Sequence, residues 1–89
     1  MMNKFTFIAQ YKGGTYISQY DADNLTDAVF SWANNLDLQY FKAKEIKEIQ
    51  EKFRDEDFFP IPVNDVVHVW CGAISACGNF LIVNIVKTA

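Results

Sequence analysis

The sequence predicts a small α+β domain in which a four-stranded antiparallel sheet carries two helices packed on one face. Three observations lead to this fold class. Two segments near the N-terminus alternate apolar and polar residues, two segments near the C-terminus are rich in β-branched residues, and two segments between these pairs repeat apolar residues with the period of a helix. The order is therefore ββααββ, which packs as one layer of sheet and one layer of helices. At 89 residues, the length predicts a single α+β domain over residues 1–89.

The first hairpin covers residues 5–20. Its two arms, residues 5–11 and 15–20, alternate large apolar side chains with smaller or polar ones. Gly13-Gly14 between them accepts the positive φ angles of a type I′ turn. With these glycines as the loop, Tyr11 opposes Tyr16 and Phe7 opposes Tyr20. The residues expected on the core side of the sheet are Phe5, Phe7, Ala9, Tyr11, Tyr16, Ser18 and Tyr20.

Two amphipathic segments follow the hairpin. Asp23 or Asn24 can cap the first helix, and Asp27 lies in its first turn, where the helix dipole favours an anion. The second helix extends from about Lys42 to Arg54 and is rich in strong helix formers. The apolar stripe of the first helix is Leu25, Ala28, Val29, Trp32, Ala33 and Leu36, and that of the second is Ala43, Ile46, Ile49 and Phe53.

The last third of the chain predicts a connector and a second hairpin. Residues 58–62 are expected to be extended because residues before proline avoid the helical region. Val66 to Ser75 predicts the third strand and Phe80 to Thr88 the fourth. Residues 66–86 carry no formal charge and are long enough to span a bilayer as a helix. We reject that alternative because Gly72 and Gly78 interrupt a run rich in β-branched residues, which suits two strands and a turn.

The second hairpin is apolar on both alternations. One set contains Val67, Val69, Cys71 and Ala73, and the other contains Val66, Trp70 and Ile74. Helices cover only one face of a single sheet, so the other face must meet the connector of residues 58–63, a second copy or a partner protein. We expect Trp70 to be the largest side chain on that face. The predicted interaction surface is His68, Trp70 and Ile74.

No group of residues predicts catalysis or a bound cofactor. His68 and Cys71 resemble a base and a nucleophile, but their odd spacing places them on opposite faces of a strand. Together with Cys77 they lack the ligand spacing of a zinc site. The aspartates of residues 21–27 lack the glycine and the closing glutamate of a calcium loop. We therefore expect no metal and no cofactor.

Charge and cysteine content restrict the partners and the compartment. The net charge of −3 and a pI near 4.9 argue against nucleic acid, because binding to phosphates depends on Lys and Arg. Two cysteines are too few for a disulfide scaffold, and the N-terminus lacks the apolar region of a secretory signal. We expect a cytoplasmic protein that binds neither nucleic acid nor a membrane.

Residues 5–36 carry one family resemblance. Tyr11-Lys12-Gly13-Gly14-Thr15-Tyr16, followed by a helix that contains Ala28, resembles the strand-strand-helix opening of HicB-type antitoxin domains. The Pro-Asp-Leu-Pro-Gly-Cys type of segment that follows the second strand in that family is replaced here by Ser18-Gln19-Tyr20-Asp21. The resemblance implies a strand-strand-helix order and transfers no functional residue.

Two functions remain open on the sequence. The first is a small protein-interaction module without catalysis, self-associating or of the antitoxin or immunity type. The alternative is a small-molecule-binding or enzymatic domain whose aromatic pocket lies between sheet and helices. An exposed Trp70 would favour the first function, and a concave cavity with converging tyrosine hydroxyls would favour the second. The residues predicted to line that pocket are Tyr11, Tyr16, Tyr20 and Trp32.

Overall fold

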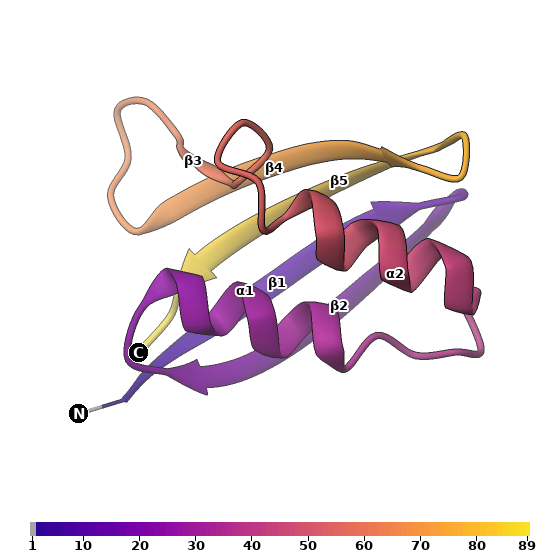
Figure 1. Ribbon diagram of the computed structural model, residues 1–89. Helices are drawn as coiled ribbons and strands as arrows, with labels where there is room; N and C mark the ends of the chain where they lie inside the picture. The colour runs from indigo at the N-terminus through magenta and orange to yellow at the C-terminus, as the bar shows by residue number, and fades with distance from the viewer. Residues whose placement is uncertain (1) are drawn as a thin grey trace.

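The computed structural model describes residues 2–89 and shows an antiparallel sheet with both helices on one face (Figure 1). The α+β class and the placement of two helices between two hairpins agree with the sequence. The elements in chain order are β1 (Asn3–Tyr11), β2 (Gly14–Ala22), α1 (Leu25–Asn34), α2 (Ala43–Lys52), β3 (Ile61–Pro62), β4 (Val69–Ala76) and β5 (Asn79–Lys87).

The sheet has five strands rather than the predicted four, in the order β2-β1-β5-β4-β3. The additional strand, β3, comes from the connector, where Ile61 pairs with Cys71 and Pro62 with Trp70. Only these two residues pair, and a proline, which has no N–H to donate, is tolerated at a sheet edge. The expectation that Phe58 and Phe59 are extended is wrong, because the Phe59 N–H donates to the Asp55 carbonyl at 3.0 Å and closes a turn.

The first hairpin turns one residue earlier than expected. Lys12 and Gly13 have φ angles of +49° and +79°, so they, and not Gly13-Gly14, form the turn. Tyr16 therefore pairs with Ala9 and not with Tyr11. Moving the turn by one residue shifts every partner by two, so each side chain keeps its face. The side chains of β1 that were predicted for the core are buried, and those of β2 are half-buried.

Helix α1 begins where the sequence indicates. The Asn24 side chain caps it by accepting the Asp27 N–H at 2.9 Å. Its buried residues include Val29 and Trp32, and the Trp32 ring stacks on Phe7 with a centroid distance of 5.4 Å and an interplanar angle of 7°. This contact fixes α1 over the first hairpin.

Helix α2 contributes Ile49 and, directly after its last turn, Phe53 to the same core. It begins one residue later and ends two residues earlier than the predicted range of Lys42 to Arg54. The core lies between the helices and the alternate side chains of β1, β5 and β4. Its large buried members include Trp32, Tyr11, Phe7, Phe53, Ile49, Leu81 and Ile85.

The third predicted strand starts at Val69 and not at Val66. Asp65 and His68 adopt φ angles of +66° and +63°, which extended residues do not have, so residues 63–68 form a loop. Val66 and Val67 are exposed there, at 52% and 78%. No helix within residues 2–89 is long and apolar enough to cross a membrane.

Candidate functional site

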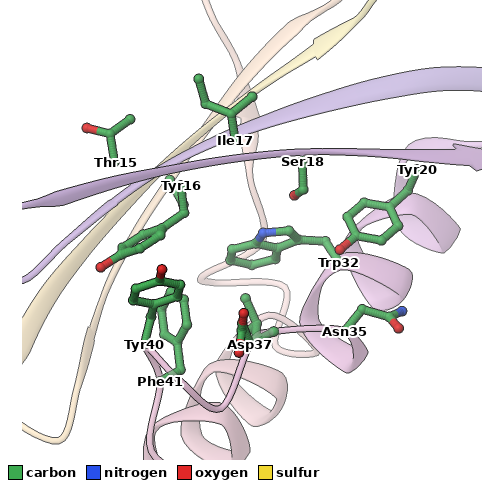
Figure 2. Close-up of a pocket in the computed structure, with 12 residues that line it drawn as sticks. Thr15, Tyr16, Ile17, Ser18, Tyr20, Trp32, Asn35, Asp37, Tyr40 and Phe41 are labelled. Carbon is green, nitrogen blue, oxygen red and sulfur yellow. The ribbon is translucent and has the colours of Figure 1, made fainter.

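An open cavity of about 390 Å³ lies between β2, the end of α1 and the segment that joins the two helices (Figure 2). We call it the aromatic cavity. Tyr16, Ser18 and Tyr20 enter it from β2, since alternate residues of a strand share a face. Trp32 enters it from α1, and Asp37 and Tyr40 come from the joining segment. Its volume is in the range of small-molecule sites.

Aromatic rings form both ends of the aromatic cavity. At one end the rings of Tyr16 and Tyr40 lie 4.8 Å apart between centroids, and Phe41 meets Tyr16 at 5.4 Å. At the other end Tyr20 packs edge-on against Phe7 at 5.8 Å. Figure 2 shows the Trp32 indole between these two ends. Trp32 is only 2% exposed, so it forms the floor of the cavity rather than a wall.

The polar side of the aromatic cavity is acidic. The exposed Asp37 lines it, and the Asp37 Oδ1 atom accepts the Gln39 N–H at 2.8 Å. The Asp37 carbonyl accepts the N–H groups of Tyr40 and Phe41 at 3.0 and 2.9 Å. One residue therefore supplies a carboxylate to the cavity and fixes the turn that brings the Tyr40 and Phe41 rings to Tyr16. No Lys, Arg or His is among the residues that line this cavity.

Three of the four residues predicted for a pocket, Tyr16, Tyr20 and Trp32, line the aromatic cavity. The fourth, Tyr11, does not. It is 2% exposed, and its hydroxyl donates to the Glu45 carboxylate at the start of α2. The Tyr11 ring stacks on Phe41 with a centroid distance of 5.1 Å, so Tyr11 packs against the segment that joins the two helices. The prediction that Tyr11 belongs to the pocket is therefore wrong.

The predicted interaction surface of His68, Trp70 and Ile74 does not form one exposed face. Ile74 is 3% exposed on the helix side, and Trp70 packs there against Phe5 at 6.0 Å. His68 is exposed in the loop before β4. The prediction that Trp70 and Ile74 face away from the helices is therefore wrong. In β4 it is Cys71, Ala73 and the residues that alternate with Trp70 and Ile74 that face away from the helices.

The side of the sheet without helices, which we call the helix-free face, has an apolar centre. Ile8 pairs with Ile17, and Ile82 pairs with both Gln10 and Ala73. Ile17 is 67% exposed and Phe80 is 59% exposed, whereas Ile8 and Ile82 are half-buried. Alternate residues of β1, β2, β4 and β5 make up this face, and the charged side chains among them are Lys4 and Asp21, which pair at 3.3 Å.

Comparisons with family models, curated proteins and solved structures find no match for this chain.

One charged side chain within residues 2–89 is buried, Glu45, at 2% exposure. Burial alone would raise its pKa. The contacts from Lys12, at 2.8 Å, from the Tyr11 hydroxyl and from the Lys42 N–H outweigh burial and lower the pKa to about 2. Burial and the adjacent carboxylate raise the pKa of Tyr11. Glu45 therefore stays ionised and ties α2 to the turn of the first hairpin.

Both cysteines are free thiols. Cys71 is half-buried and Cys77 is exposed in the turn between β4 and β5. Desolvation of the thiol and the neighbouring Glu48 carboxylate raise the pKa of Cys77, which opposes thiolate formation. Residues 2–89 also contain no group of three or more His, Cys, Asp or Glu side chains arranged to hold a metal ion.

Proposed function

We propose that this chain is a small protein-interaction module without catalysis, and that its helix-free face binds a second copy of the chain. The observation that carries the proposal is the apolar, almost uncharged character of this face, on which Ile17 of the edge strand β2 and Phe80 at the start of β5 are more than half exposed. These two residues, and not Trp70, which packs on the helix side, supply the exposed apolar surface. Exposed apolar area of this kind is costly in water and marks interaction sites. A twofold contact, in which the same patch meets itself, is the commonest geometry for such an assembly.

The size of the helix-free face supports a weak dimer. Strands of eight or nine residues are about 30 Å long, and four of them side by side are about 19 Å wide. Two such faces bury roughly 1,100 Å² together, which is near the lower limit for a specific interface. Interfaces at this limit are typical of weak, transient contacts, so we expect micromolar rather than nanomolar binding. The paired Lys4 and Asp21 leave no net charge on the face to oppose the contact.

Mass measurement by light scattering tests this function. From about 10 micromolar to several hundred micromolar, the average mass is expected to rise from 10.2 kDa toward twice that value. Ile17→Lys and Phe80→Lys place a charge in the interface at exposed sites and should keep the chain monomeric. Leu38→Lys is the matched control, because Leu38 is 71% exposed in the segment that joins the helices. A wild-type mass that stays at 10.2 kDa throughout would contradict self-association.

A second candidate function rests on the aromatic cavity. We propose it as a site for a small ligand, because Tyr16 and Tyr20 from β2 and Trp32 from α1 enclose it together with a carboxylate. The side chains that carry the two functions alternate along β2, with Tyr16 and Tyr20 toward the cavity and Ile17 toward the helix-free face. We also propose a cytoplasmic location, because free thiols, one of them exposed, persist in a reducing compartment.

A further inference from the structure

The aromatic cavity combines electron-rich rings with a single kind of charge. Its ends are formed by the phenol rings of Tyr16, Tyr40 and Tyr20, and its floor by the Trp32 indole (Figure 2). The faces of such rings are negative and attract cations. Asp37 adds a carboxylate, and no basic side chain is among the lining residues to neutralise it.

The surrounding chain reinforces this field. Residues 22–37 contain three aspartates and no Lys, Arg or His, and this segment forms the end of β2, all of α1 and the start of the joining segment. A cavity lined by one sign of charge concentrates ions of the opposite sign. An anion entering this cavity would meet the Asp37 carboxylate with no cation to pair with.

The side chains of the aromatic cavity are also held in place. Tyr16 contacts both Tyr40 and Phe41, Tyr20 contacts Phe7, and Trp32 is fixed between Phe7 and Phe53. Rings that are already ordered lose little conformational freedom when a ligand enters. Ser18, which lies between Tyr16 and Tyr20 on the same face of β2, is small and leaves the space between the two ends open.

From these observations we propose that the aromatic cavity binds an organic cation with an alkylated ammonium head. The inference rests on the second candidate function, that this cavity is a ligand site. Such a head has no N–H donors that demand several acceptors, and it gains most from aromatic faces with one nearby carboxylate. The head belongs either to a free small molecule or to a methylated lysine of a peptide. Because β2 is the edge strand of the sheet, its unpaired side lies beside the cavity and can add backbone hydrogen bonds to a peptide.

Titration with matched probes tests this inference. Trp70→Phe leaves Trp32 as the one tryptophan, so its emission reports on the cavity, and amide NMR shifts locate the site. The probes are choline, its uncharged isostere 3,3-dimethylbutan-1-ol, and a short peptide that carries trimethyllysine. We expect choline to bind roughly ten-fold more tightly than the isostere, since that is the effect of a desolvated cation–π contact. If the peptide binds more tightly than choline, the source of the cation is a polypeptide; if it does not, the source is a free molecule.

Two variants test the contributions of the Asp37 carboxylate and the Tyr40 ring to choline binding separately from any general loss of structure. Asp37→Asn keeps the Oδ1 acceptor for the Gln39 N–H and should weaken choline binding about five-fold, as expected for a partly exposed ion pair. Asp23→Asn is its control, with the same change of net charge in an exposed residue that does not line the cavity. Tyr40→Leu, at a site 47% exposed, should weaken choline binding and leave binding of the isostere unchanged.

The outcomes distinguish the inference that the ligand is a cation from the proposal that the cavity is a ligand site. If the isostere binds as tightly as choline, or if Asp37→Asn has no more effect than Asp23→Asn, the cavity is a ligand site but the inference of a cationic ligand is wrong. If no probe changes the Trp32 emission or the amide shifts of β2, the second candidate function fails as well.

Discussion

Acid is expected to destabilise the fold through Glu45. The Glu45 carboxylate pairs with Lys12 and accepts hydrogen bonds from Tyr11 and the Lys42 backbone, and its pKa is lowered from 4.5 to about 2. Because the pKa in the folded state lies below that of the unfolded chain, the ionised carboxylate stabilises the fold above about pH 4.5. This contribution is lost as the pH falls toward 2.

The size of the effect follows from the shift of the pKa. The lowering of the Glu45 pKa from 4.5 to about 2 corresponds to roughly 3 kcal/mol of folding free energy, and about 2 kcal/mol of this is lost by pH 3. Domains of this kind have total stabilities of about 5–15 kcal/mol. The contribution of this one side chain is therefore a large fraction of the total stability.

Urea unfolding at pH 6 and pH 3, followed by tryptophan fluorescence, measures this contribution. Glu45→Gln cannot titrate, so its stability deficit relative to wild type should shrink by about 2 kcal/mol between the two pH values. Glu51→Gln, at an exposed position of the same helix, is the control. Its own stability difference from wild type should change by no more than about 0.5 kcal/mol between pH 6 and pH 3. A deficit of Glu45→Gln that is equal at both pH values would show that the carboxylate is not held ionised by its neighbours.

Two further predictions concern the core. Trp32→Ala removes an indole stacked on Phe7 and should cost about 3–5 kcal/mol in urea unfolding, whereas a loss below about 1 kcal/mol would contradict its buried position. Deletion of residues 80–89 removes nearly all of β5, the central strand that joins the two hairpins, and should unfold the whole chain. Dispersed amide NMR resonances from β1 and β2 in the truncated chain would refute this cooperativity.

The parts of the fold that follow local rules could be predicted from the sequence. Leu25 to Leu36 shows a helical period directly after a capping Asn24, so the position and the buried face of α1 are both determined locally. The exact turn of the first hairpin is not determined locally, because the Lys12-Gly13 and Gly13-Gly14 turns differ only in which residue adopts a positive φ. The observed turn brings Lys12 within 2.8 Å of Glu45, and it leaves Gly14 in the strand below the Tyr16 phenol, where a Cβ would lie 2.5 Å from the hydroxyl oxygen. The contact between Lys12 and Glu45 is tertiary, so the local sequence pattern does not reveal it.

The orientation of β4 could not be predicted for a related reason. When both alternations of a strand are apolar, its own pattern does not indicate which set is buried. Pairing with β5 decides it, since Trp70 lies beside Ile85 and Ile74 beside Leu81, both of which face the helices. The loop at residues 63–68 was missed because its positive φ angles occur at Asp65 and His68 and not at glycine.

Some residues of the aromatic cavity could be predicted from local sequence patterns, and others depend on tertiary contacts. Tyr16 and Tyr20 follow a period of two and Trp32 a period of 3.6, so their convergence could be predicted. Tyr40 belongs to a segment without periodicity, and only the hydrogen bonds to the Asp37 carbonyl bring it to Tyr16. The spacing of Asp37 before Tyr40 and Phe41 is compatible with a turn, but it does not indicate which strand the residues of that turn contact.

Strand β2 separates the two proposed surfaces residue by residue. Tyr16, Ser18 and Tyr20 point to the aromatic cavity, and Ile17 between them points to the helix-free face. Ile17 is nevertheless among the residues that line the cavity, so the substitution that alters only the proposed dimer contact is one at Phe80, which does not line it. A substitution at Tyr40 alters the cavity from a segment outside the sheet. Loss of both functions from either of these single exposed substitutions would indicate that β2 itself had been displaced.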